Sequence, residues 1–142
     1  MSKMGNLSNG IIQFGGKVFA ISPTLTLQDF LQSDLYSDVK EEIINDFSRF
    51  TLLPQTFNGI RLSVSLLFGN QKKIFLVNIS KVMDQDSSWN SWSEQRELER
   101  KKEHDILLEK LIGNTSCKYT WGEITSDYDP RSGSSMITIR YF

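Results

Sequence analysis

The chain has 142 residues, of which 39% are hydrophobic, 23% charged and 11% aromatic. This length is typical of one domain with its own hydrophobic core, and the composition lies outside the range of disordered chains. The 16 Lys and Arg residues against 17 Asp and Glu give a formal charge of -1, with an isoelectric point near 5.8. This balance argues against a protein that mainly grips a nucleic-acid backbone, although a local basic patch stays open.

Cysteine usage and hydropathy indicate a soluble protein of a reducing compartment. Cys117 is the only cysteine, so no intramolecular disulfide can form, and a single thiol fits the cytoplasm better than the periplasm. The N-terminus lacks the apolar core of a signal peptide, and no apolar run reaches the length of a membrane span. We expect a cytoplasmic protein with a single domain over residues 1–142, in which residues 1–9 form a flexible N-terminus.

The first elements are a predicted hairpin and a short helix. Residues 10–14 and 17–21 are apolar stretches that flank the glycine pair 15–16, which can take the positive φ angles of a two-residue turn. Farther along, Thr26 predicts the start of a helix over 27–31, because its hydroxyl can accept a hydrogen bond from an early helix amide.

The middle of the chain contains an ambiguous stretch and then two clear strands. In residues 36–50 the apolar side chains recur with helical spacing, and we interpret this stretch as a second helix. Residues 60–68 alternate between apolar and polar, which is typical of a half-buried strand. Residues 74–79 form a short apolar run after turn residues, so the two segments predict a central antiparallel pair.

A long helix is predicted over residues 92–112. Ser91 and Glu94 have the spacing of a capping box, in which each side chain satisfies the other's free backbone amide. Gly113 follows the last apolar residue and provides a stop signal.

Two more strands are predicted after this helix, over 117–127 and 136–142, around a loop rich in Gly and Ser. The strands occur in hairpins and do not alternate with helices, which favours an α+β fold. We expect a single domain with an antiparallel sheet of about 5–6 strands, one long helix in the C-terminal half, and one or two shorter N-terminal helices packed on it.

His104 is the only histidine and the main candidate for catalysis. Helical phase places it beside Leu107 and Leu108, facing the protein body. With Arg100 and a nearby carboxylate it could act as the general base of a small hydrolase or nuclease-like enzyme, but Asp105 points about 100° away on the helix and is poorly placed to orient it. We prefer a structural network in which His104 and Arg100 bond to the C-terminal hairpin, formed by Glu97, Arg100, His104 and Ser126.

Other catalytic and metal motifs are missing from the sequence. The loop 129–135 is Gly-rich but does not open a helix or end in Lys-Ser or Lys-Thr, so we interpret it as a connection. One histidine and one cysteine cannot build the usual zinc sets without several carboxylates. We therefore predict no catalytic residue, no metal and no cofactor.

Several short motifs in the C-terminal part resemble a known class of proteins. They are Trp89-x-x-Trp92-Ser93-Glu94, Arg100-Lys101-x-x-His104-Asp105, Tyr119-x-Trp121-Gly122, Ser126-x-Tyr128-Asp129-Pro130-Arg131-Ser132-Gly133 and a terminal Ile-x-Ile-x-Tyr. In this order they resemble small enterobacterial immunity proteins, which are encoded beside toxins of contact-dependent growth inhibition or related polymorphic systems. The resemblance covers roughly residues 89–142, and more loosely Phe14-Gly15-Gly16-Lys17.

The resemblance implies a small, non-enzymatic cytoplasmic protein that binds a cognate toxin domain and occludes its active site or substrate groove. We expect it to be a monomer or weak dimer, with no nucleic-acid or membrane partner. Because acidic patches complement basic toxins, predicted loops and hairpin ends are the candidate contact regions. The partner-binding residues that we select there are Asp84, Asp86, Trp89, Asp127, Asp129 and Arg131.

Overall fold

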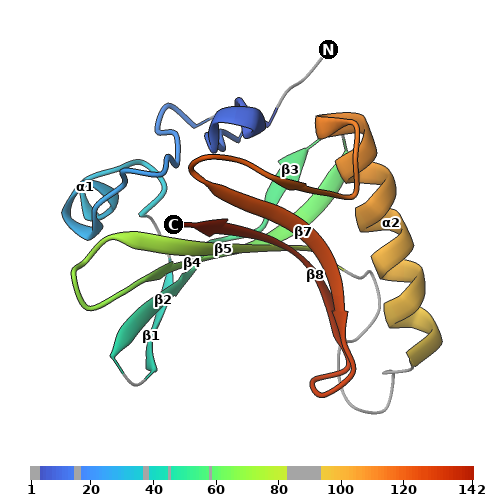
Figure 1. Cartoon of the computed structure of the whole chain (residues 1–142). Coiled ribbons are helices and arrows are strands. Elements are labelled where there is room, and N and C mark those ends of the chain that lie inside the picture. Colours follow the sequence, from blue (N-terminus) through green and yellow to red (C-terminus); the bar gives the residue numbers. More distant parts are fainter. Residues whose placement is uncertain (1–3, 15–16, 37–38, 45, 58, 83–93) are drawn as a thin grey trace.

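The computed structural model describes residues 4–14, 17–36, 39–44, 46–57, 59–82 and 94–142 (Figure 1). These residues form an α+β fold built on one antiparallel sheet of eight strands, in the order β1-β2-β4-β5-β8-β7-β6, with β3 paired to β4. The strands are β1 Lys40–Ile44, β2 Phe47–Thr51, β3 Gln55–Phe57, β4 Ile60–Phe68, β5 Ile74–Lys81, β6 Ser116–Lys118, β7 Gly122–Asp129 and β8 Ser134–Tyr141. The helices are η1 Leu7–Asn9, α1 Leu27–Leu31 and α2 Glu94–Ile112.

The predicted fold class is confirmed, but the sheet is larger than the 5–6 strands expected. Figure 1 shows that the sheet bends into an arch, with the β1–β2 hairpin and the β7–β8 hairpin as its two feet. Helix α2 packs against β7 and β8, and α1 with the N-terminal segment, residues 4–14 and 17–25, covers another part of the same outer face of the arch.

The central pair of strands agrees with the sequence prediction. Strand β4 spans Ile60–Phe68 and pairs antiparallel with β5. In β4 the side chains of Leu62, Val64 and Leu66 are 0% exposed, because every second residue points into the core. Strand β5 also pairs with β8, so the two middle strands carry the sheet from one foot of the arch to the other.

The stretch predicted as a second helix is a β-hairpin. Strands β1 and β2 pair with each other through Ile44 and Phe47, and β2 also pairs with β4. Without β2, the backbone groups along one edge of β4 would lack hydrogen-bond partners. Residues 47–51 supply these partners only as a strand, which explains why this stretch is not a helix. The same pairing buries Phe50, whose ring lies 5.1 Å from that of Phe30 and 5.8 Å from that of Phe68.

Helix α1 begins as predicted. The Thr26 hydroxyl accepts a hydrogen bond from the Asp29 amide at 3.2 Å, which satisfies one of the amides left free in the first turn. The helix buries Phe30 completely, against the aromatic rings of Tyr36, Phe50 and Phe68. Such ring pairs contribute about 0.5–1.5 kcal/mol each beyond the apolar area that they bury.

The predicted N-terminal hairpin is irregular: in the described residues an antiparallel bridge joins Ile12 and Ile21, whose backbones exchange two hydrogen bonds of 2.8 Å, and the Lys17 amide donates to the Phe14 carbonyl at 3.2 Å. The turn at 15–16 lies outside the described residues. The amides of Val18 and Phe19 bind the Asp34 carboxylate, at 2.7 and 3.1 Å, and are therefore not used in a ladder with residues 10–14. The side chain of Asp34 thus competes with the hairpin for the same backbone donors.

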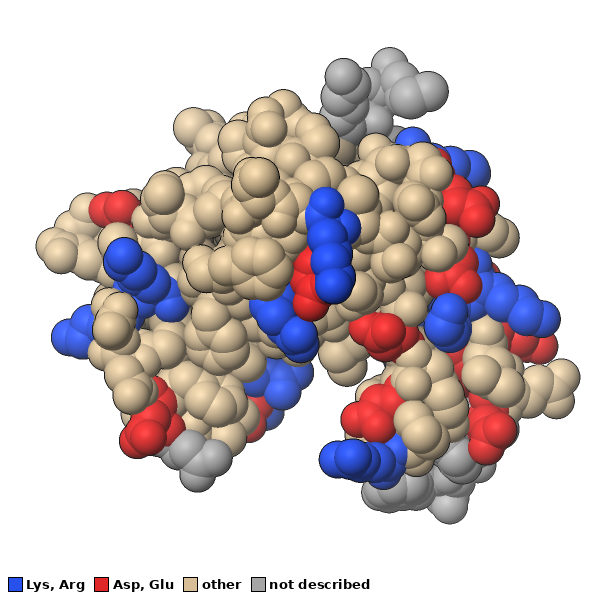
Figure 2. Space-filling model, viewed as in Figure 1, with Lys and Arg blue, Asp and Glu red and all other residues tan. Residues whose placement is uncertain are grey.

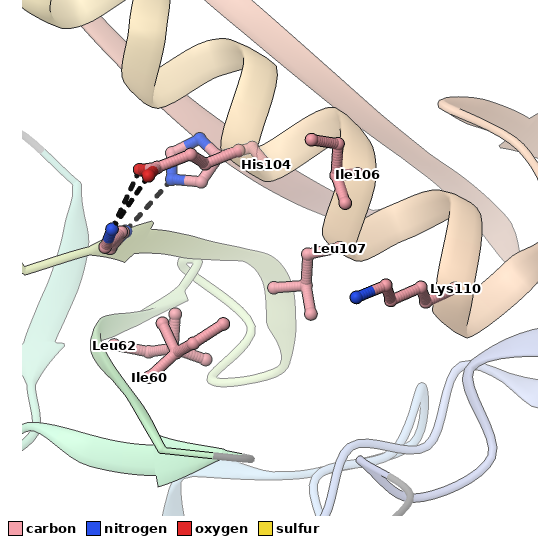
Figure 3. Close-up of a pocket in the computed structure, with 8 residues that line it drawn as sticks. Ile60, Leu62, His104, Ile106, Leu107 and Lys110 are labelled. Atoms are coloured by element: carbon pink, nitrogen blue, oxygen red, sulfur yellow. Dashed lines mark hydrogen bonds and ion pairs between the residues drawn. The ribbon is translucent and has the colours of Figure 1, made fainter.

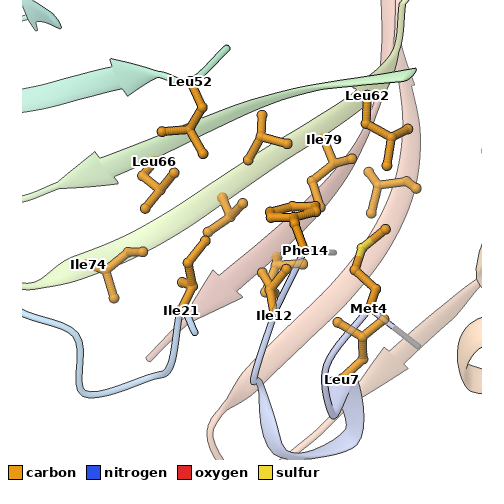
Figure 4. Close-up of a cluster of buried hydrophobic side chains, with 14 of the residues drawn as sticks. Met4, Leu7, Ile12, Phe14, Ile21, Leu52, Leu62, Leu66, Ile74 and Ile79 are labelled. Atoms are coloured by element: carbon orange, nitrogen blue, oxygen red, sulfur yellow. The ribbon is translucent and has the colours of Figure 1, made fainter. Parts of the chain in front are cut away.

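The N-terminal segment closes the core on the face of the sheet that the helices cover (Figure 4). Ile12 and Ile21 are 0% exposed and Phe14 is 2% exposed. Residues 4–9 are packed and do not form the loose extension expected for residues 1–9, because Met4 and Leu7 are buried against the core. Residues 1–3 lie outside the described part of the chain.

Trp121 is half-buried and packs at the rim of the core. Its indole Nε1 donates to the Ser8 carbonyl at 2.8 Å, and its ring stacks on that of Tyr119 at 5.0 Å. A Cβ at Gly122 would lie 1.9 Å from the Arg140 carbonyl oxygen, so glycine permits the close approach of the β8 backbone.

Replacing this glycine should destabilise the fold. For Gly122→Ala we expect the free energy of unfolding to fall by about 1–3 kcal/mol or more, because a methyl group must displace backbone. Gly69→Ala is the matched control, since its Cβ would have its nearest contact at 3.6 Å, from the Phe75 ring. Chemical denaturation followed by circular dichroism measures both, and equal stability of the two variants would contradict the close-approach argument.

Candidate functional site

Helix α2 presents one side to the sheet, and its buried residues mark that side. They are Glu97, His104, Leu107 and Leu108. Leu107 and Leu108 contribute the apolar part and pack with strand residues such as Ile79 and Ile124. The N-terminal half of the same side is polar. Glu97, Arg100 and His104 are its ionisable residues and therefore the candidates for a chemical role between helix and sheet. The capping box predicted with Ser91 lies outside the described residues.

Glu97 connects α2 to strand β8. Its carboxylate accepts a hydrogen bond from the Ser135 amide at 3.1 Å, and its main-chain carbonyl accepts one from the Ser135 hydroxyl. The Arg100 guanidinium lies 3.3 Å from the same carboxylate and balances its charge. The link between helix and C-terminal hairpin, which we assigned to His104 and Arg100, is therefore made by Glu97.

His104 bonds to a different strand from the one predicted. Its Nε2 accepts a hydrogen bond from the Lys81 amide at the end of β5, at 2.9 Å (Figure 3). A ring nitrogen that accepts an amide proton carries none itself, so the neutral imidazole holds its proton on Nδ1. The side chain is 1% exposed, and burial together with the nearby Arg100 charge lowers its pKa to about 4. At neutral pH His104 is thus an uncharged group engaged with the backbone.

The predicted polar network is only partly assembled. Glu97 and Arg100 form an ion pair, whereas His104 bonds to β5. Within the described part of the chain, Ser126 Oγ has no hydrogen-bond partner, and neither do the buried Arg100 Nε and His104 Nδ1. Ser126 therefore does not join the network through a direct bond.

A pocket of about 160 Å³ lies beside His104, between α2 and the adjoining ends of β4 and β5 (Figure 3). Most of its lining is apolar, and its charged groups come from one lysine of β5 and from α2. The lining residues are Ile60, Leu62, Lys81, Glu103, His104, Ile106, Leu107 and Lys110. Sequence reasoning missed this pocket, because its walls come from segments about 40 residues apart and each wall by itself has the pattern of ordinary core.

The opposite face of the sheet carries a row of polar groups beside apolar side chains such as Leu67 and Leu76. Residues of α1 and α2 both pack on the side that carries Phe50, Val77 and Ile139. Because side chains alternate along each strand, the other side carries a row of hydroxyl and amide groups that neither helix covers. Two hydrogen bonds join members of this row across strands, Thr51 to Ser65 at 3.2 Å and Thr138 to Asn78 at 3.4 Å. We call this surface the polar sheet face.

The polar sheet face lies on the inner side of the arch. The space-filling view shows a hollow between the two feet, with acidic and basic side chains on both of its sides (Figure 2). The hollow indents the contour of the molecule in this view. Its two walls come from hairpins toward opposite ends of the sheet.

Three of the predicted partner-binding residues lie together on the β7–β8 foot. Asp127, Asp129 and Arg131 are all exposed. Asp127 accepts a hydrogen bond from the Thr125 hydroxyl at 2.6 Å, and Asp129 accepts one from the Arg131 amide at 2.9 Å. These bonds hold both carboxylates in place on the β7–β8 foot, one of the two feet that flank the hollow. The other three candidates, Asp84, Asp86 and Trp89, lie outside the described residues.

The described ranges offer neither a metal-binding cluster nor a membrane-spanning helix. There, His, Cys, Asp and Glu side chains form no group of three or more that could hold a metal ion. Neither α1 nor α2 combines the length and the apolar character needed to cross a membrane. Comparison with known protein families, characterised proteins and solved structures gave no match. The function is therefore argued from the residues of this chain.

The lowered pKa of His104 predicts a pH-dependent stability. In the unfolded chain the imidazole takes up a proton near pH 6.5, whereas in the native protein it does so only near pH 4. Native stability is therefore fully present above pH 6.5 and falls as the pH drops through this window, by about 3 kcal/mol at 1.36 kcal/mol per pH unit.

The control is His104→Gln, which keeps an acceptor for the Lys81 amide but cannot be protonated. Its free energy of unfolding, measured by urea denaturation from pH 7 to 4, should depend less steeply on pH than that of the native protein. Carboxylates titrate at the lower end of the range in both proteins, so the difference between the two curves isolates His104. Parallel curves would show that its protonation is not coupled to folding.

Glu97 should contribute more to stability than other acidic residues of α2. Glu97→Ala leaves the Ser135 amide unpaired and the partly buried Arg100 without its counter-ion. We expect a loss of about 3 kcal/mol in the free energy of unfolding, since truncating one partner of a buried ion pair costs about that much. Glu99→Ala, at an exposed position of the same helix, should change it by less than about 0.5 kcal/mol. Thermal denaturation of both variants is the measurement.

Proposed function

We propose that this protein is an immunity protein, which binds a cognate toxin domain and occludes its active site or substrate groove without catalysis of its own. The proposal joins the sequence resemblance to one structural observation, the polar sheet face, on which neither α1 nor α2 packs, with its flanking hairpin. A rigid sheet that buries one face and leaves the other free has a surface available for a partner. Hydroxyl and amide groups on that surface can donate and accept hydrogen bonds across an interface.

The charge at the β7–β8 foot supports a basic partner. Asp127 and Asp129 are exposed, and their hydrogen bonds to Thr125 and to the Arg131 amide fix their orientation. Preorganised carboxylates steer a basic partner during encounter and lose little side-chain entropy on binding. Arg131 beside them would contact an acidic group at the rim of such a toxin, and this mixed pattern supports discrimination between partners.

The alternative of a small hydrolase or nuclease-like enzyme depends on His104, and the geometry of that residue favours a structural role. A general base needs a free nitrogen within reach of substrate and a pKa near the working pH. The Nε2 of His104 accepts from the Lys81 amide, the side chain is 1% exposed, and its pKa is lowered to about 4. We therefore assign His104 to the fold.

In this proposal the protein acts in the cytoplasm, where a toxin domain would reach its target, and as a monomer or weak dimer. The partner would lie across the hollow with its catalytic groove against the polar sheet face. Occlusion requires only that the complex is long-lived, since affinity differences between related complexes come mainly from dissociation rates.

Charge reversal at the β7–β8 foot tests the proposal. The probe is the toxin domain that the resemblance implies is encoded beside this chain, expressed with its active site inactivated. Calorimetry should show a 1:1 complex with the native protein, and the double variant Asp127→Lys, Asp129→Lys should weaken it by at least about tenfold, or ~1.4 kcal/mol. The association rate should fall more at low salt than at high salt, because the effect is electrostatic.

Glu109→Lys is the matched control, since Glu109 is exposed on α2. It changes the net charge in the same direction and should leave affinity near the native value. Growth of cells that produce the active toxin domain provides a second readout, in which the native protein and the control variant protect and the double variant protects less. Absence of both a complex and protection would overturn the proposed function; a tight complex unaffected by the double variant would remove the β7–β8 foot from the interface.

A further inference from the structure

We infer that the pocket beside His104 binds a small organic anion with a compact apolar body, such as a phenyl-substituted or branched-chain carboxylate. This site is separate from the polar sheet face, and the inference does not depend on the proposed function. It follows from three properties of the pocket: its volume, its buried apolar floor and the charges at its mouth.

The volume fits one ring or one branched alkyl group. The pocket measures about 160 Å³. An engineered apolar cavity of about 150 Å³ in another protein binds benzene, so a space of this size accommodates a single aromatic ring. A dinucleotide or a long acyl chain would exceed it.

The floor and the walls of the pocket are apolar and firmly held. Leu62 is 0% exposed and Leu107 is 7% exposed, so both are fixed by the core behind them. Figure 3 shows that Leu62 and Ile60 face Leu107 across the pocket, with Ile106 and Lys110 on the adjoining turns of α2. Each methylene group that moves from water onto such a surface gains about 0.8 kcal/mol.

The mouth of the pocket carries an excess of positive charge. Lys81 and Glu103 form an ion pair at 2.9 Å and largely neutralise each other. Lys110 lies one helical turn after Ile106, is exposed, and forms no ion pair or hydrogen bond within the described residues. A ligand carboxylate can pair with this ammonium group while its apolar body stays in the pocket, in the manner of pockets that combine apolar walls with a few polar anchors.

A small molecule fits this site better than a side chain of a protein partner. A protein interface surrounds its anchoring pocket with further apolar surface that excludes water. Here the mouth is bordered by charged groups, namely Lys81, Glu103 and Lys110, and among the described residues that line the pocket Ile106 is the exposed hydrophobic one. The apolar area is thus concentrated inside the pocket.

Binding is tested with 3-phenylpropanoate and its uncharged analogue 3-phenylpropan-1-ol. In methyl NMR spectra of the full chain, 3-phenylpropanoate should shift the signals of Ile60, Leu62 and Leu107 in a saturable way, and its ring protons should give NOEs to these methyl groups. The alcohol should bind about tenfold more weakly. Lys110→Gln should remove this difference by weakening only the carboxylate, and Ile60→Trp should abolish binding of both by filling the pocket.

Lys102→Gln removes a charge from an exposed position of the same helix and is the matched control, which should bind 3-phenylpropanoate like the native chain. Native positions of the methyl signals away from the pocket, in each variant without ligand, show that the variant is folded. The inference is overturned if neither ligand shifts the pocket methyl signals, or if Ile60→Trp binds as well as the native chain. Equal affinity for acid and alcohol would overturn the assignment to an anion.

Discussion

The structure depends on the burial of one face of a continuous antiparallel sheet. Phe50, Leu66, Val77 and Ile139 come from successive strands and lie on the same side, and α1, α2 and the N-terminal segment all pack there. Because side chains alternate along a strand, the burial of these residues places their neighbours in sequence on the opposite side of the sheet. The division between a core face and a polar sheet face is therefore made once, by register, for the whole molecule.

Helix α2 packs on the buried face of the sheet with both apolar and ionisable side chains. Its apolar half, with Leu107 and Leu108, is held by the sheet, and its polar half must then satisfy Glu97, Arg100 and His104 in a partly dry environment. Glu97 does so through Ser135 and Arg100, and His104 does so through the Lys81 amide. These bonds fix the helix at two points on different strands, β8 and β5. The pocket beside His104 is the space left where the helix and the ends of β4 and β5 diverge.

Local sequence patterns predicted an element correctly where its conformation depends on residues within the element itself. Thr26 predicts the start of α1, and alternation over 60–68 predicts β4 with its observed bounds. They failed where a distant partner competes. The helical spacing in 36–50 is real, but pairing to β4 outweighs it, and the Asp34 carboxylate takes amides that the N-terminal hairpin would need. Both errors share one cause, the demand of backbone groups for hydrogen-bond partners, which propensity does not measure.

The sequence by itself determined the α+β class, the central strand pair, the long helix and the inward direction of His104, because each follows from periodicity within one segment. Only the tertiary structure decided that His104 bonds to β5, that Glu97 holds the C-terminal hairpin, and that Asp127 and Asp129 lie on one of the two feet that flank the hollow. These features depend on strand order and sheet curvature. They join residues tens of positions apart, and no local pattern encodes which of them meet.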